Sequence, residues 1–123
     1  MPTAPGAALS VTRGSWRTLA RNTLVGLIAL LSILPGHWKA HLATTGALHD
    51  CVHIAAFFLL ALLSIKRNAA LKKVLLTCAL LALFGVVLEF LQTRIFHIRL
   101  EVSDILDDCA GLFLGVVTST MLR

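Results

Sequence analysis

The chain has 123 residues, of which 58% are hydrophobic and only 14% are charged. This length holds a single domain, and soluble domains average roughly 45–50% apolar and about 25% charged residues. We therefore expect the excess apolar surface to face a lipid bilayer. The net charge of +5 raises the question of nucleic acid, but the basic residues flank apolar segments and are not interleaved with aromatic ones, so no nucleic-acid partner is expected.

Four apolar segments are long enough for transmembrane helices, which need about 20 residues, with a range of about 17–25. They cover residues 17–34, 48–65, 74–91 and 105–122. Pro35 and Gly36 end the first of them. The sequence thus predicts an all-α membrane protein, a compact bundle of four transmembrane helices. This bundle forms one domain over residues 17–123, after a flexible cytoplasmic tail at residues 1–16.

Basic residues predict the orientation of the bundle. Eight of the eleven Lys and Arg residues lie at one end of the predicted helices. Since Lys and Arg favour the cytoplasmic side, both termini should be cytoplasmic, and the loops at residues 35–47 and 92–103 should face outward. The arginines before the first apolar run also fit a signal peptide cleaved near residues 43–47. We expect an uncleaved helix and keep the cleaved form as the alternative.

The acidic and histidine residues gather at the outward ends of the predicted helices, where all six acids and all five histidines lie. A charged side chain inside the bilayer costs at least ~2.5–3.5 kcal/mol, so such groups usually have partners. Residues three or four apart share a helix face. This spacing predicts one polar cluster with Arg99 or Arg94 as its counter-ion: Asp50, His53, Glu89, Gln92, Asp104 and Asp108. The other histidines are expected to be solvated loop residues: His37, His41, His49 and His97.

Several members of this cluster have alternative roles. Glu89 and His53 are the candidates for a catalytic acid or base, while a hydrogen bond from His53 to Asp50 is the structural alternative. Asp104 or Ser103 could instead cap the last helix. The carboxylate oxygens and the imidazole of this cluster would suit Mg²⁺, Mn²⁺ or Zn²⁺ as metal ligands. However, no spacing resembles a known metal motif such as His-Glu-x-x-His, so neither a metal nor a cofactor is expected.

The last predicted helix carries a small-residue motif on the face that bears its acids. Gly111 and Gly115 form a G-x-x-x-G, which predicts close packing against a neighbouring helix. The three cysteines show no metal-type spacing. They are expected to be small buried apolar side chains, with a disulfide between the first and the last as the alternative: Cys51, Cys78 and Cys109.

Several of these residues follow one another in a distinctive order at the edges of the helices. In chain order they are Asp50-Cys51-Val52-His53, Phe57-Phe58, Glu89-Phe90-Leu91-Gln92, Arg99, the run from Asp104 to Gly111, and Gly115. This ordered set resembles the VanZ-like family of small bacterial membrane proteins. Two features depart from the family pattern: Asp108 stands where the family usually has Asn, and the interval from Arg99 to Asp104 is one residue shorter.

The resemblance implies a multi-pass protein of the bacterial cytoplasmic (inner) membrane and a link to low-level resistance against the glycopeptide teicoplanin. The cluster is then expected to bind a polar cell-envelope ligand, such as a lipid-linked precursor, a glycan or a glycopeptide. Three alternatives stay open: an intramembrane acid/base enzyme acting on an envelope lipid, a proton-coupled transporter, and a purely structural bundle. The sequence also leaves open whether a reaction is catalysed and whether the chain forms a homo-oligomer.

Overall fold

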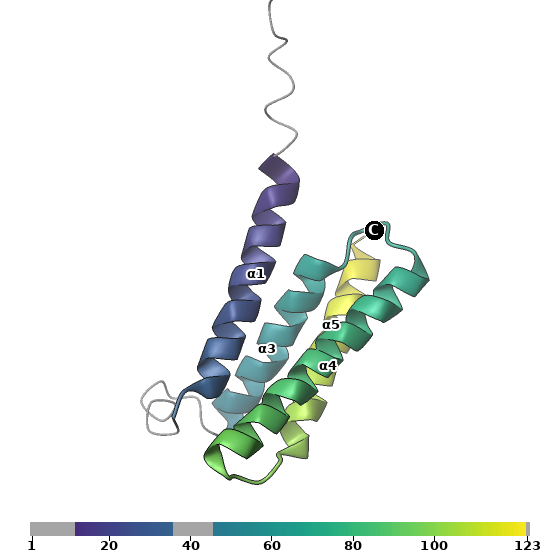
Figure 1. The fold of residues 1–123 in the computed structure, drawn as a ribbon. Coiled ribbons are helices and arrows are strands. Elements are labelled where there is room, and N and C mark those ends of the chain that lie inside the picture. Colours follow the sequence, from purple (N-terminus) through teal and green to yellow (C-terminus); the bar gives the residue numbers. More distant parts are fainter. Residues whose placement is uncertain (1–11, 36–45, 123) are drawn as a thin grey trace, which may run out of the picture.

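The computed structural model describes residues 12–35 and 46–122, and this part of the chain consists of four helices without a strand. They are α1 (Thr12–Ile33), α3 (Ala47–Ser64), α4 (Leu71–Phe96) and α5 (Val102–Met121). The helices lie lengthwise beside one another (Figure 1), and α3 contacts each of the other three. The predicted all-α class is confirmed. The alternative cleavage region and the histidines at 37 and 41 lie outside the described residues.

The ends of the helices differ from the predicted segments. α1 begins at Thr12, inside the stretch predicted as a tail. α4 continues to Phe96, so Gln92 and Arg94 are helical and do not lie in a loop. No glycine or proline lies between the predicted end of this helix at residue 91 and its observed end at Phe96. It ends where His97 adopts a left-handed conformation with φ 52°, a common way for a helix to finish. The connection between α4 and α5 is correspondingly short.

A side chain of α1 satisfies the end of α3. The last carbonyl groups of a helix have no partner within the helix. The Arg17 guanidinium donates to the carbonyl oxygens of Leu62, at 2.6 Å, and Ile65, at 3.5 Å. Both bonds place a positive charge at the negative end of the α3 dipole, which is favourable. A residue predicted only as a topology signal therefore also docks α1 against α3.

The closest helix contact is between α3 and α5. A Cβ atom built on Gly111 would collide with the carbonyl oxygen of Ile54, and one built on Gly115 would lie 2.5 Å from the Ala61 Cβ. The absence of side chains at these two glycines therefore lets the helix backbones approach, as small residues do in membrane bundles. Beside this contact lies the apolar core of the described residues: Phe57, Leu60, Ala61, Ile65, Val74 and Leu112.

Much of the apolar surface faces outward. α3 and α4 are each long and apolar enough to cross a membrane, with mean hydropathies of 1.8 and 2.6. Only 17% of the apolar window of each is buried, which is unlike the core helix of a soluble protein. On α4, Leu75, Leu80 and Leu83 are all more than half exposed. α1 carries three arginines in its first half, and α5 carries three aspartates in its own.

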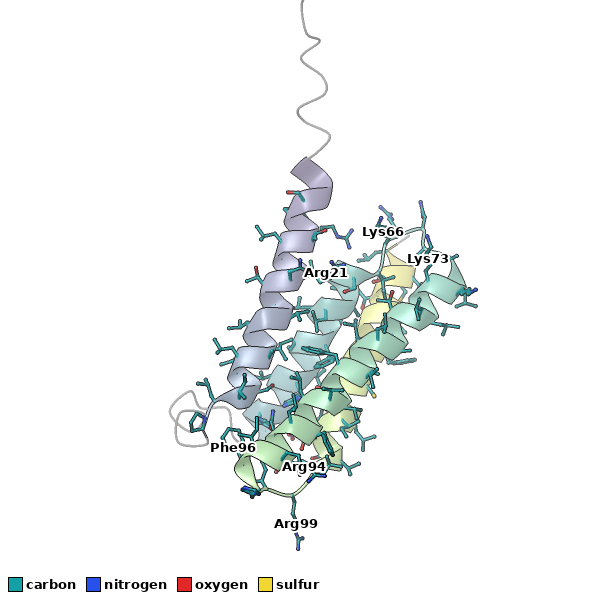
Figure 2. The ribbon with its side chains drawn as sticks, viewed as in Figure 1. Arg21, Lys66, Lys73, Arg94, Phe96 and Arg99 are labelled. Carbon is teal, nitrogen blue, oxygen red and sulfur yellow. The ribbon has the colours of Figure 1, made fainter. Side chains whose placement is uncertain are left out.

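Both ends of the bundle carry basic residues, but the acidic residues lie near one end only. Figure 2 shows Lys66 and Lys73 at one end and Arg94 and Arg99 at the other. The end with Lys66 and Lys73 also holds the C-terminus and the start of α1 (Figure 1). The acidic and histidine side chains described below lie near the opposite end, at the beginning of α3, the end of α4 and the beginning of α5.

Candidate functional site

Two histidines of α3 meet two aspartates of α5. We call these four residues the His–Asp cluster: His49, His53, Asp104 and Asp108. His49 and His53 are one helical turn apart and so share a face of α3. Asp104 and Asp108 have the same spacing on α5. Because Gly111 brings the two helices together one turn deeper, these two faces oppose each other and their side chains interact.

The shortest contact in the cluster joins His53 to Asp108. The His53 Nδ1 lies 2.7 Å from the Asp108 Oδ1, and the Asp108 side chain is 6% exposed. An ionised carboxylate only accepts hydrogen bonds, so the ring nitrogen is the donor. Gly85 of α4 makes room for this carboxylate, since a Cβ there would lie 2.6 Å from the Asp108 Oδ2. Three helices therefore define the position of one carboxylate.

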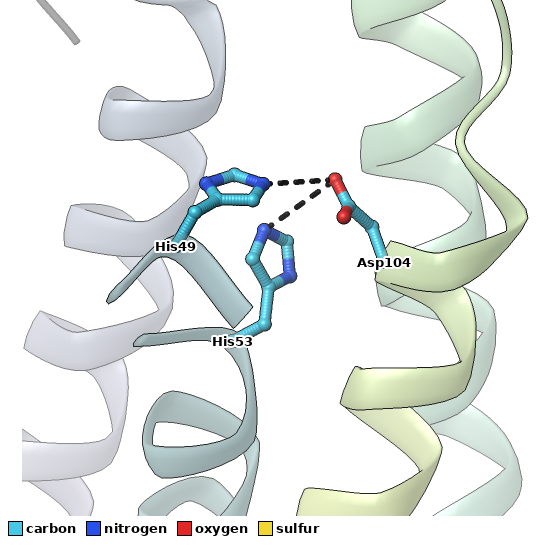
Figure 3. A group of neighbouring side chains, drawn as sticks. All are labelled: His49, His53 and Asp104. Atoms are coloured by element: carbon cyan, nitrogen blue, oxygen red, sulfur yellow. Dashed lines mark hydrogen bonds and ion pairs between the residues drawn. The ribbon is translucent and has the colours of Figure 1, made fainter. Parts of the chain in front are cut away.

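Asp104 contacts both histidine rings (Figure 3). Its Oδ2 lies 3.1 Å from the His49 Nε2 and 3.7 Å from the His53 Nε2. The two rings meet edge to face with centroids 4.6 Å apart. The Oδ1 of the same carboxylate is buried and has no hydrogen-bond partner among the described residues. This is a notable feature because buried polar atoms are almost always paired.

Glu89 is also buried, at 4% exposure, but it has a different partner. Its Oε1 accepts a hydrogen bond of 2.8 Å from the backbone N–H of Glu101. Glu101 is the N-cap residue of α5, and no side chain of that helix caps its start. The Glu89 carboxylate therefore joins the end of α4 to the start of α5, at the positive end of the α5 dipole. Glu89, the leading catalytic candidate from the sequence, thus makes a contact that holds two helices together.

Three further acidic residues lie beside the cluster or at the start of α5: Asp50, Asp107 and Glu101. Carboxylate oxygens of Asp50 and Asp107 lie within 4.8 Å of one another and of Asp104. Asp50 is exposed, Asp107 is half-buried and Glu101 is exposed. His53 is hydrogen-bonded to Asp108 across the helix interface, so the predicted bond to Asp50 on its own helix is replaced by this contact.

The predicted arginine counter-ion does not lie in the cluster. Arg99 is exposed, and its side chain points away from the helices in Figure 2. Arg94 lies over the Phe90 ring, 5.1 Å from its centroid. Gln92 is half-buried, and its side chain makes no hydrogen bond to another described residue. Within the described part of the chain, the only ion-pair partners of the buried carboxylates are histidines, which carry a positive charge only when protonated.

Sequence analysis missed His49, which it assigned to a solvated loop. His49 lies in the first turn of α3 and contacts Asp104. Its spacing to His53 is the available signal: His-Asp-x-x-His places two imidazoles on one helix face, as in the zinc motif His-Glu-x-x-His. Asp104 also does not take the alternative role of helix N-cap that the sequence allowed. The N-cap position belongs to Glu101, and Asp104 lies within the first turn of α5.

The cysteines differ in exposure from the expectation that all three are buried. Cys51 and Cys109 are exposed thiols, and Cys78 is half-buried.

No family model matches this chain, and neither a curated protein nor a solved structure does. The VanZ-like resemblance therefore stays a prediction from the order of residues. The His–Asp cluster itself offers two imidazoles from α3 and two carboxylates from α5.

Proposed function

We propose that the chain is an integral protein of the bacterial inner membrane, of the VanZ-like kind, whose four helices all cross the bilayer. Both termini and the connection between α3 and α4 are cytoplasmic in this arrangement. It is supported by the exposed apolar sides of α3 and α4. It is also supported by the position of Lys66 and Lys73 at the same end as the C-terminus, which agrees with the Lys/Arg bias of cytoplasmic loops.

In this membrane the His–Asp cluster binds the polar head of a lipid-linked cell-envelope precursor from the outer side. The observation that carries the proposal is the convergence of buried carboxylates and imidazoles from α3 and α5 at the outward end. Carboxylates accept hydrogen bonds from hydroxyl, amide and ammonium groups, which are the groups of sugars and short peptides. Ionisable groups at membrane depth are expensive, and a ligand site is the usual reason for keeping them.

An apolar groove favours a ligand with a lipid tail over a free glycan. The groove lies between α4 and α5 and has a volume of about 450 Å³. Its lining is almost entirely apolar and includes Val74, Cys78 and Leu112. It also includes Cys109, the residue after Asp108. An acyl or prenyl chain in this groove would lead toward the cluster, where the head group binds.

Ligand retention tests this proposal. The protein is extracted from bacterial membranes in mild detergent and analysed by native mass spectrometry. The wild type should carry a lipid-linked adduct, and Asp104→Asn and His49→Ala should lower its occupancy. Hydrogen bonds to charged groups contribute ~1.5–3 kcal/mol, so the affinity should fall by about tenfold or more.

Lys66→Gln serves as the matched control, because Lys66 is exposed at the opposite end of the bundle. It should retain the adduct. Absence of any adduct from the folded wild type, or equal occupancy in the wild type and Asp104→Asn, would contradict the proposal. Teicoplanin susceptibility of cells with and without the protein tests the resistance link separately.

A further inference from the structure

Three residues of the His–Asp cluster lie close enough together to bind one metal ion. His49, His53 and Asp104 each offer one donor atom, and these three atoms lie within 4.8 Å of one another. Zinc binds histidine nitrogen at about 2.0–2.1 Å in a tetrahedral arrangement, which puts neighbouring donors about 3.3 Å apart. The Asp104 Oδ2 lies 3.1 Å from one imidazole nitrogen and 3.7 Å from the other. These two distances lie on either side of the tetrahedral value.

The orientation of the His53 ring is compatible with a metal ion bound at its Nε2. Its Nδ1 donates to Asp108, so in the neutral ring Nε2 carries the lone pair. That lone pair faces the Asp104 Oδ2 at 3.7 Å, and both atoms are then acceptors. Either a second proton on the ring or a metal ion between the two atoms removes this repulsion. A metal-bound histidine whose other nitrogen donates to a carboxylate is the usual arrangement in zinc proteins.

The unpaired oxygen of Asp104 is an independent indication. Asp104 is 4% exposed and its Oδ1 has no hydrogen-bond partner among the described residues. A buried acceptor without a partner is costly, and a cation bound by both oxygens of this carboxylate would meet that need. The surroundings are strongly negative as well, since Asp50, Asp107 and Asp108 are nearby and no described Lys or Arg pairs with the cluster.

We propose that His49, His53 and Asp104 bind one divalent transition-metal ion, Zn²⁺ by the nature of the donors, and that Asp108 positions the His53 ring. Two imidazoles and one carboxylate leave a fourth tetrahedral position free. An oxygen of the envelope ligand can occupy that position. Only this last step rests on the proposed function, because metal binding depends on the three side chains alone.

Metal titration of the full chain in detergent tests the inference. The protein is stripped with a chelator and titrated with ZnCl₂ against a fluorescent zinc indicator, in a background with His37, His41 and His97 replaced by Ala. One saturable Zn²⁺ per chain is expected. Asp108→Asn should weaken binding by the ~10–100-fold typical of outer-shell partners. His49→Ala and Asp104→Asn, which remove donors, should weaken it further.

Matched controls keep the result interpretable. Glu101→Gln alters an exposed acid near the end of the bundle and should leave the affinity unchanged. The visible spectrum of the Co²⁺ form should report tetrahedral coordination in the wild type and lose it in His49→Ala, while circular dichroism shows that each variant is folded. Absence of saturable binding in the folded wild type, or binding that survives Asp104→Asn, overturns the metal site. Neither result depends on a lipid, so the ligand proposal can fail or stand separately.

Discussion

Three carboxylates of this chain are almost fully buried, and each has a different environment. Asp108 accepts a hydrogen bond from a histidine, Glu89 accepts one from a backbone N–H, and Asp104 has one oxygen unpaired. Burial of a charge is tolerated only where partners compensate for the lost water. The three residues therefore differ in what their removal will change, although all three belong to one predicted cluster.

Substitution of Glu89 should affect stability more than binding. Glu89→Ala removes the acceptor of the Glu101 N–H, and an unmet hydrogen bond of this kind costs ~1–3 kcal/mol. Glu89→Gln keeps a carbonyl oxygen in place, so it should cost clearly less. Chemical unfolding in detergent, followed by circular dichroism, measures the difference. If Gln destabilises as much as Ala, the negative charge at the start of α5 matters and the hydrogen bond to the Glu101 N–H does not.

At the scale of the elements, the contact between α3 and α5 determines the geometry of the cluster. Helical spacing fixes which residues of one helix share a face, but it does not fix how two helices are rotated about their axes. Here Gly111 lies against the backbone of Ile54, and Gly115 lies against Ala61 and Phe58. This packing turns Asp104 and Asp108 toward the histidine face of α3.

Adding a methyl group at Gly111 should therefore separate the helices and disrupt the cluster. Gly111→Ala places a Cβ against the Ile54 carbonyl, which is backbone and cannot move aside cheaply. Overpacking of this kind typically costs ~1–3 kcal/mol. Gly26→Ala is the control, because nothing lies within 4 Å of its added Cβ, and a helical Gly→Ala change favours the helix by about 0.5–1 kcal/mol. Thermal unfolding that shows equal effects for the two variants would argue against tight α3–α5 packing.

For the whole molecule, the distribution of charge and apolar surface is the dominant feature. Lys66 and Lys73 lie at one end, and the His–Asp cluster lies near the other. Between the ends, α3 and α4 expose long apolar sides. A bilayer would cover these sides and leave the two ends in different compartments, which the proposed orientation requires.

Cysteine accessibility in intact cells tests that orientation. In a chain with its three natural cysteines replaced by Ser, Arg99→Cys should react with a membrane-impermeant maleimide from outside. Arg67→Cys, in the connection between α3 and α4, should react only after the cells are permeabilised. Both positions are exposed, so a difference in labelling reports the compartment. The reverse pattern would place the cluster on the cytoplasmic side and remove the case for an outer envelope ligand.

Composition and the positions of the apolar segments were sufficient to predict the all-α class and the four helices, because hydropathy and helix signals are local properties of the chain. The gathering of acids and histidines near the helix ends opposite the basic ones was visible in the same way. The sequence also placed Asp104, Asp108, Gly111 and Gly115 on one stripe of a helix, since their spacing follows from the geometry of a single helix.

Only the tertiary structure decided which of these side chains meet. It paired His53 with Asp108 instead of Asp50, brought His49 into the cluster and left Arg99 outside. It also gave Glu89 a backbone partner twelve residues further along the chain. These contacts join separate helices, and the His–Asp contacts among them depend on the rotation and separation that glycine packing imposes between α3 and α5. That information is a property of the assembled bundle, and no single helical segment contains it.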